Sequence, residues 1–533
     1  MRTLLTRNRI GTYAVALCLA VFASVALRHG LTTTADLDWP GHMDLYRDIA
    51  QARVFLQGNW LGDPYYREQQ LWYSPLVPAM VAVAAKVTGI EVHLLYTRLG
   101  AYLNLFGIVA FFALVAASYG RHAALAATFA FLFINGLSLP FWATASYSPW
   151  LLASQFSQTL FYCCALSYSH ALARDQYRWY LLSGCLMGLA FLGHSVPGLV
   201  LAIATSLVAL RKLMLGGNTT RGRTVTQLLV MGVSAFVLSF PFLYSVFGSY
   251  GLGVMNPTPG SWLFLQPAEF FDAVVEISTP LAALGLLWAW RHRREYPANQ
   301  MFGAICITCL ALVAARYTFS QWPLAPLHHF VLYLKAIEAV YFGVGFAAVS
   351  TFLSTIVSAR IGKPSSAGAF VYWAALAIFV LWIGPKYPPP QGFEEKRGAA
   401  LAWQWRRDRL AAVDWIESST NPSDIFLCDD RTALFAVGPA GRYVLAAHEV
   451  FTNPYLNWGI RDKRRRRLLG FLESGAEERF REYAARHNVT YVMLDEDREN
   501  PDHLLNRKNL TRLSCLQAVF QRGVVTIYRV VQS

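Results

Sequence analysis

Three side chains near the start of the chain have types and spacing that suit acid–base chemistry. Asp38 and His42 lie four residues apart, and Asp44 follows two residues later, in the stretch ADLDWPGHMDLYRD. A carboxylate beside an imidazole can act as a general base or bind a metal ion. It can equally cap a helix, because a helix that begins near Pro40 would place Asp38 just before its first turn. The spacing alone allows both interpretations.

These residues lie in an acidic and aromatic loop, residues 31–78, directly after the first apolar segment. From 42 to 56 the apolar side chains recur at helical spacing, which predicts a short helix along the membrane face. Gly58 is expected to end this helix. Prolines then mark turns before a second short helix that extends to about Lys86. The loop could also be a solvated connection with no chemical role.

The composition of the whole chain indicates a membrane protein. Of its 533 residues, 55% are hydrophobic and only 15% are charged, whereas a soluble protein has roughly a quarter charged residues. Apolar runs of spanning length predict a polytopic α-helical membrane protein with about 11 transmembrane helices. The predicted spans are 11–27, 99–118, 123–141, 151–169, 180–193, 195–210, 225–247, 273–290, 301–315, 328–350 and 366–384. We therefore assign residues 1–384 to a transmembrane module.

The net charge of +14 gives no reason to expect nucleic acid as a partner, because much of the excess of Lys and Arg lies in short loops between the apolar segments. Alternate loops contain Lys and Arg, while the loops at 142–150, 194–198, 248–268 and 320–327 contain none. Such alternation is typical of the positive-inside bias. It predicts a cytoplasmic N-terminus and places the 31–78 loop and the C-terminal tail on the outer side.

The tail is predicted to form a small α/β domain, residues 399–533, after a proline-rich linker at 385–398. Helices are expected at 399–418, 459–474 and 475–486, and strands at DIFLCDD, RYVLAAH, VTYVMLDE and VVTIYRVV. Cys428 and Cys515 could form a disulfide in an oxidising compartment. The basic run 461–467 is either a solvated helix face or a contact for anionic lipid headgroups.

The outer loop and the layout of the chain resemble the C-type (GT-C) glycosyltransferases. That superfamily includes oligosaccharyltransferase catalytic subunits, protein O-mannosyltransferases, aminoarabinose transferases and mycobacterial arabinosyltransferases. The motif D-W-P-G-H is similar to the D-x-x-x-H pattern of bacterial members with an outer C-terminal domain. The resemblance implies an enzyme of the bacterial inner (plasma) membrane that transfers a hexosyl or pentosyl group from a polyprenyl-phosphate sugar to a glycan, lipid or protein acceptor.

The resemblance also implies roles for the loop residues. A loop carboxylate of this superfamily activates the acceptor or binds a divalent cation, so the role passes to Asp38 or Asp44. Asp38 fits the D-x-x-x-H form, and Asp44 fits better the distance to the helix-ending glycine. A cation such as Mg²⁺ or Mn²⁺ would be held by Asp38 and His42.

Donor cleavage also needs cations near the departing phosphate, and charged residues in a bilayer are by default functional. Candidates for substrate binding therefore lie near the outer ends of the spans: Arg98, His194, Glu269, Asp272, Arg316, His328, His329 and Lys335. Glu269, Asp272 and Glu276 are expected to share one helical face. Lys335 could hold the phosphate, or could simply pair with Glu338 three residues later. His194 could equally be a structural histidine.

Two other functions compete with glycosyl transfer. A transporter or flippase for a lipid-linked substrate would favour repeated halves and a charged midplane site, and the sequence shows no two-fold repetition. A membrane scaffold would leave the acidity of the first loop unexplained. The sequence therefore favours the enzyme.

Overall fold

The structure is a computed structural model that describes residues 9–135, 146–251, 253–256, 267–319, 326–361, 364–387, 390–404, 406–496, 505 and 507–531. The chain forms two compact units. The first comprises Met1–Ala35, Arg98–Ser239 and Leu263–Glu395, and the second comprises Asp36–Thr97, Phe240–Trp262 and Lys396–Ser533. This grouping differs from the predicted limits, which assign the outer loop 31–78 to the membrane module.

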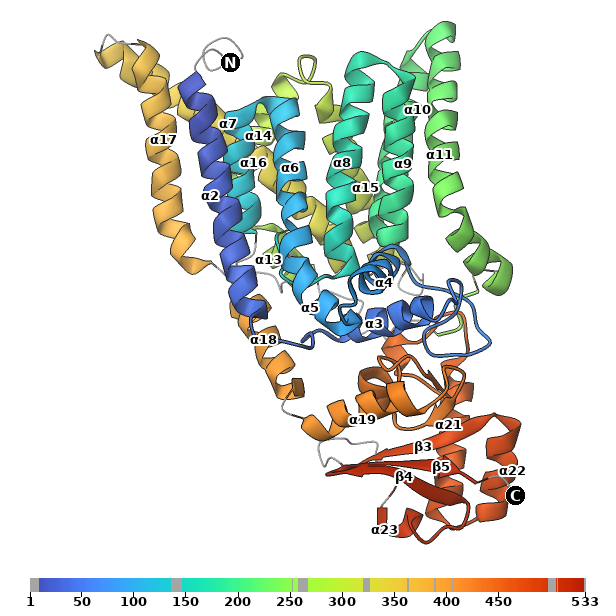
Figure 1. The fold of residues 1–533 in the computed structure, drawn as a ribbon. Coiled ribbons are helices and arrows are strands. Elements are labelled where there is room, and N and C mark those ends of the chain that lie inside the picture. Colours follow the sequence, from blue (N-terminus) through green and yellow to red (C-terminus); the bar gives the residue numbers. More distant parts are fainter. Residues whose placement is uncertain are drawn as a thin grey trace. The chain divides into compact units, whose positions relative to one another are not determined.

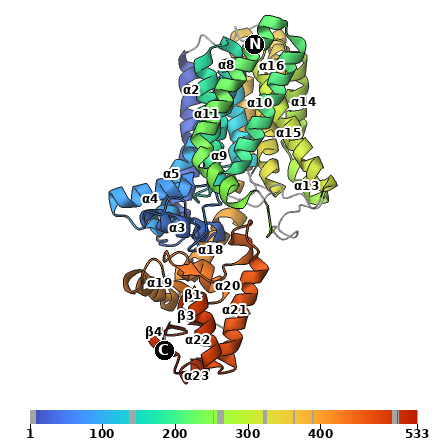
Figure 2. The same ribbon diagram turned by 90° about the vertical axis from the view of Figure 1, so that its right-hand side faces the viewer.

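Long helices make up the first unit and run alongside one another in both views (Figure 1, Figure 2). They are α2 (Arg9–Thr34), α5 (Val92–Leu103), α6 (Leu105–Tyr119), α7 (Arg121–Phe129) with the π-helical turn Ala130–Ile134, α8 (Ala153–Arg174), α9 (Tyr177–Gly193), α10 (Ser195–Leu215), α11 (Asn218–Tyr250), α13 (Pro267–Val274), α14 (Thr279–Arg291), α15 (Ala298–Thr318), α16 (His328–Ile361) and α17 (Pro364–Ile383), followed by the 3₁₀ turn Gly384–Lys386. Each predicted span coincides with helix, although 123–141 extends beyond the described residues. The segment 273–290 is divided between α13 and α14.

Seven helices of the described chain are long and apolar enough to cross a membrane. They are Gly11–Thr34, Val92–Tyr119, Ser195–Leu215, Asn218–Tyr250, Ala298–Thr318, His328–Ala359 and Ala369–Lys386. Other predicted spans form helices that are not long or apolar enough to count among these seven. For example, α9 has 17 residues and α14 has 13. The prediction of a polytopic α-helical membrane protein is confirmed.

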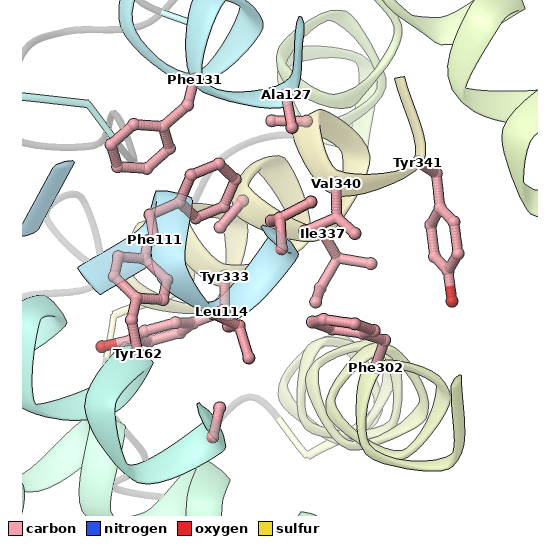
Figure 3. Packing of buried hydrophobic residues seen from close by; sticks show 14 of the residues in the cluster. Phe111, Leu114, Ala127, Phe131, Tyr162, Phe302, Tyr333, Ile337, Val340 and Tyr341 are labelled. Carbon is pink, nitrogen blue, oxygen red and sulfur yellow. The ribbon is translucent and has the colours of Figure 1, made fainter. Parts of the chain in front are cut away.

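Aromatic and small side chains fill the core of this helical unit (Figure 3). Phe111 and Phe131 stack with their ring centroids 4.3 Å apart, and Tyr162 meets both rings edge-on. Gly343 allows α16 to approach α7 closely, because a Cβ there would lie 2.2 Å from the carbonyl oxygen of Ala123. Small residues at such crossings are typical of helix packing in membranes.

The second unit combines the outer loop with the tail. Its elements are α3 (Met43–Leu56), α4 (Leu76–Thr88), α18 (Pro390–Gln404), α19 (Arg407–Ser419), β1 (Ile425–Leu427), α20 (Asp430–Thr432), η4 (Ala433–Val437), β2 (Tyr443–Val444), η5 (Glu449–Phe451), α21 (Trp458–Glu473), α22 (Glu477–Arg486), β3 (Val489–Asp495), α23 (Arg507–Leu510), β4 (Leu516–Arg522) and β5 (Val525–Val530). The sheet order is β2-β1-β3-β5-β4. β1 runs parallel to β2 and β3, and β5 runs antiparallel to β3 and β4.

Alternate side chains of β3 face the two covered sides of this sheet, as the period of a strand requires. Val492 and Leu494 belong to the apolar cluster that includes residues of α21 and α22. Tyr491, directly before Val492, packs edge-on against Trp415 of α19. The predicted α/β domain is therefore present.

Three details of the tail differ from the sequence prediction. α18 begins at Pro390, inside the predicted linker, because proline is well suited to the first turn of a helix. The single helix expected at 399–418 is instead α18 and α19. Strand β4 was not predicted, because its exposed Gln517, Gln521 and Arg522 hide the apolar pattern. Cys428 and Cys515 are buried as free thiols.

Candidate active site

His42, and not Asp38, caps the first helix of the outer loop. The backbone of His42 is extended, and its Nδ1 accepts a hydrogen bond of 3.2 Å from the backbone N–H of Asp44. Burial is the main cause that lowers the pKa of His42; Asp44 opposes this effect, and Lys396 and Arg47 lower the pKa further. The imidazole is therefore a neutral acceptor near pH 7. The interpretation of Asp38 as the cap is wrong, because the helix begins one residue after His42.

Asp38 is exposed, and its backbone is held from both sides. Its N–H donates to Oε1 of Gln404 at 3.1 Å, and its carbonyl oxygen accepts from the hydroxyl of Thr97 at 3.3 Å. Gln404 also donates to the carbonyl oxygen of Asp36 at 3.2 Å. A solvent-accessible carboxylate on a fixed backbone is suited to meet a substrate.

The glycine of the D-W-P-G-H motif has a steric role. A Cβ at Gly41 would lie 1.9 Å from the carbonyl oxygen of Lys396 and 3.1 Å from the backbone nitrogen of Ala400. Only glycine therefore lets α18 lie this close to the loop. The helix that brings Gln404 to Asp38 thus depends on Gly41.

Asp44 belongs to a network centred on Arg47. The guanidinium of Arg47 lies 3.4 Å from the Asp44 carboxylate and 2.8 Å from that of Asp48, and it stacks 3.5 Å from the ring centroid of Tyr73. The side chain of Asp44 is 39% exposed, whereas that of Asp48 is 1% exposed. Burial raises the pKa of Asp48 to about 6, and the positive charge of Arg47 opposes this rise. Asp48 thus anchors Arg47, which in turn positions Asp44.

The residues expected to bind a divalent cation do not form a metal site. In the described part of the chain, no group of three or more His, Cys, Asp or Glu side chains is arranged to hold a metal ion. Nδ1 of His42 is already engaged by the N–H of Asp44. Mg²⁺ is usually held by one or two carboxylates together with substrate phosphates and water, so Asp38 and His42 alone do not make up a complete site.

Asp63 joins the outer loop to the tail and was not among the predicted site residues. Its Oδ1 accepts the backbone N–H groups of Tyr65 at 2.8 Å and Tyr66 at 3.0 Å, and its Oδ2 accepts from the side-chain amide of Asn453 at 3.0 Å. Burial raises the pKa of Asp63 to about 6, while these hydrogen bonds oppose the rise. The sequence shows only an acidic loop, because the partner amide lies in the tail.

Lys335, predicted to hold a phosphate, is buried in the first unit between two carboxylates. Its Nζ lies 3.0 Å from Glu276 and 2.5 Å from Glu338. Glu338 also accepts hydrogen bonds from the hydroxyls of Ser278 at 2.6 Å and Thr279 at 2.8 Å. Pairing with Glu338, the alternative in the sequence, is therefore what the structure shows, with Glu276 as an added partner.

The acidic residues near this triad do not share one helical face as predicted. Glu269 and Asp272 lie on α13 and are exposed, but α13 ends at Val274. Glu276 therefore lies in the turn before α14, where it reaches Lys335. The prediction assumed a helix that continues through this turn.

Three histidines of the first unit come together. The ring centroids of His194 and His329 are 4.6 Å apart, and those of His328 and His329 are 4.2 Å apart. His194 caps α10, since its Nδ1 accepts from the N–H of Val196 at 3.4 Å. This cap is the structural role that the sequence left open for His194.

The two remaining candidates differ in exposure. Arg316 is buried near the end of α15, and Arg98 is exposed within α5. Arg98 therefore lies inside a helix, not at the start of a span as expected, because the helix begins earlier at Val92.

No family model and no curated protein sequence matches the chain. Solved structures do. AglB, the oligosaccharyltransferase of Archaeoglobus fulgidus, in complex with an inhibitory peptide and a dolichol-phosphate, has a TM-score of 0.53 and 14% identity over 92% of this chain and 70% of that chain. ArnT from Cupriavidus metallidurans bound to undecaprenyl phosphate has a TM-score of 0.53 and 16% identity over 96% of this chain and 98% of that chain.

The arabinofuranosyltransferase AftD from Mycobacteria also matches, with a TM-score of 0.53 and 14% identity over 97% of this chain and 40% of that chain. The fold is that of the GT-C glycosyltransferases. The GT-C fold accounts for the order of the elements: a first helix, an outer loop with short helices, a helical bundle and a C-terminal domain. The resemblance stated from the D-W-P-G-H loop is confirmed at the level of the fold.

Proposed function

We propose that this protein is a membrane glycosyltransferase that moves a sugar from a polyprenyl-phosphate donor to an acceptor on the outer face of a bacterial plasma membrane. The GT-C fold supports glycosyl transfer in general. ArnT was solved with undecaprenyl phosphate and AglB with a dolichol-phosphate, which supports a lipid phosphate as the carrier. The distribution of Lys and Arg among the loops supports the outer location of the acidic loop.

The acceptor hydroxyl or amine must lose a proton as it attacks the donor sugar, so a carboxylate is needed beside it. Asp38 is our choice for this general base. The observation that carries the choice is its exposed side chain on a backbone held by Gln404 and Thr97. Asp44 is the second candidate, and its contacts with Arg47 and His42 favour a positioning role.

The departing phosphate needs cations. Arg98 is our candidate because it is an exposed arginine. Lys335 is not, because two carboxylates already neutralise its charge. We assign no step to a metal ion.

The test is glycosyl transfer by the purified protein in detergent micelles. The donor would first be identified by chromatography of the lipid-linked sugars that accumulate in a strain lacking the protein. The purified protein should then release the lipid phosphate and form a glycosylated acceptor. In micelles no compartments exist, so a transporter would leave the donor intact. An unchanged donor in the presence of acceptors from the same cells would contradict the proposal.

A further inference from the structure

A cavity of about 390 Å³ lies within the second unit, next to the loop that carries Asp38. Its walls come from the loop before α3, from α18, from the start of α19 and from the α20–η4 segment. The volume falls in the range of small-molecule sites. None of its lining residues belongs to a helix that could cross a membrane.

Cations dominate the polar part of this cavity. Lys396, Arg406 and Arg431 line it, together with Arg409 and Asp495, which form an ion pair with each other. Among the described lining residues, Asp495 is the only carboxylate. Lys396 also contributes to the lowered pKa of the neighbouring His42, after burial, the larger cause. The cavity is thus electropositive, which suits an anionic ligand.

An aromatic group forms the apolar part. The rings of Trp403 and Phe435 are 5.4 Å apart, and Tyr46 lies 5.7 Å from Trp403 and 4.7 Å from Phe435. All three rings line the cavity. Aromatic faces offer flat, weakly polar surfaces on which the C–H face of a sugar ring can pack. A small inorganic anion would leave this surface unused.

We propose that the cavity binds an acidic sugar unit of the acceptor, that is, a sugar ring that bears a carboxylate or a phosphate. The sugar face packs on Trp403 and Phe435, and Arg406, Arg431 and Lys396 hold the anionic group. This inference rests on the proposed function, because it names the acceptor class of the same enzyme. Its position beside the loop of Asp38 is consistent with an acceptor that extends toward the catalytic carboxylate.

Calorimetric titration of the purified full-length protein tests the inference without requiring transfer. The probes are trigalacturonate, glucose 6-phosphate, neutral maltotriose and inorganic phosphate. We expect trigalacturonate or glucose 6-phosphate to bind, and the one that binds identifies the anionic group. If neutral maltotriose bound with equal affinity, the cavity would not recognise negative charge. If inorganic phosphate bound as tightly as both anionic sugars, the cavity would not recognise the sugar ring.

Variants locate the binding. Arg406→Gln with Arg431→Gln should weaken binding about tenfold or more, the usual loss when charged hydrogen bonds are removed. Phe435→Leu should weaken binding of the anionic sugar and leave that of inorganic phosphate unchanged. Lys463→Gln with Arg464→Gln, on the exposed face of α21, is the matched control and should bind normally. Normal binding by the Arg406/Arg431 variant would overturn the proposal; if that variant unfolds, Lys396→Gln gives the same test.

Binding and catalysis are separated by Asp38→Asn. This variant should bind the anionic sugar with unchanged affinity and fail in transfer. If both anionic sugars bind but no transfer occurs with the native protein, the proposed enzyme fails and the pocket remains. If transfer occurs and neither anionic sugar binds, the pocket assignment fails and the enzyme remains.

Discussion

Two charged sites of this protein, one in each unit, are built in opposite ways. In the first unit, Lys335 is fully buried, and Glu276 and Glu338 surround it with side chains that are 7% and 10% exposed. In the second unit, Asp38 is exposed, and Lys396 and Arg406 line a cavity. Charges that are buried and matched hold a fold together, whereas charges that face water on a fixed backbone can meet a substrate. We therefore assign a structural role to the charged groups around Lys335 and a functional role to Asp38 and the cations of the cavity.

The largest expected effect is on the buried triad. Lys335→Met leaves two carboxylates buried without their cation and should lower the free energy of unfolding by about 3–5 kcal/mol. Thermal unfolding in detergent micelles measures this change. Adding Glu276→Gln and Glu338→Gln should restore part of the stability. If Lys335→Met kept its stability and lost only activity, Lys335 would be a substrate ligand and the comparison would fail.

A smaller effect is expected on the pH dependence of stability, through the carboxyl group of Asp48. Burial raises the pKa of Asp48 from 3.8 to about 6 in the folded protein, so the folded state binds this proton more tightly than the unfolded state. The resulting stabilisation is complete below pH 4 and is lost as the pH rises through 6. It amounts to about 3 kcal/mol, at 1.36 kcal/mol for each pKa unit.

Asp48→Asn has no such proton to release. Between pH 3 and pH 7, the native protein should therefore lose about 3 kcal/mol relative to Asp48→Asn, as measured by unfolding at several pH values. Parallel pH profiles for the two proteins would show that Asp48 titrates normally and that burial does not raise its pKa.

Gly41→Ala tests the close contact that fixes the loop of Asp38. The new Cβ would collide with the backbone of α18, and such overpacking costs about 1–3 kcal/mol. We expect a lower unfolding temperature and weaker binding in the cavity, because Lys396 must move. Gly398→Ala is the matched control, since a Cβ at Gly398 meets no atom within 4 Å. Equal stability of the two variants would contradict the steric role of Gly41.

The smallest effect is expected on α21. Lys463 and Arg464 are exposed on this helix, so replacing both with Gln should change stability by less than about 0.5 kcal/mol. Transfer rates should also be unchanged. A marked loss of transfer would show that the basic run 461–467 contacts a substrate or anionic lipids, the alternative that the sequence offered.

Local patterns made much of this fold predictable. Apolar runs marked the helices, Gly58 marked the end of α3, and four strands of the tail followed from alternating or continuous apolar residues. Contacts between distant segments were not predictable. The pairing of Glu276 with Lys335, and of Asp63 with Asn453, depends on tertiary structure that a single sequence does not display.

In the candidate site, too, local features can be predicted from the sequence, whereas contacts between distant segments cannot. The D-W-P-G-H loop is recognisable from its residue types. The sequence alone allows Asp38 as the helix cap, because the exact start of α3 is set by the extended backbone at His42. The cavity was missed entirely. Its cations are spread from Lys396 to Arg431, and Gly41 lets α18, which carries Lys396, lie against the loop.

The rate of sugar transfer by Asp38→Asn tests the central claim most directly. It should be measured in a single turnover with the purified protein, beside the native protein and Asp44→Asn. We expect a loss of about 100-fold or more for Asp38→Asn, as is usual for a general base, with unchanged unfolding temperature and a smaller loss for Asp44→Asn. Transfer by Asp38→Asn at the native rate would contradict this expectation.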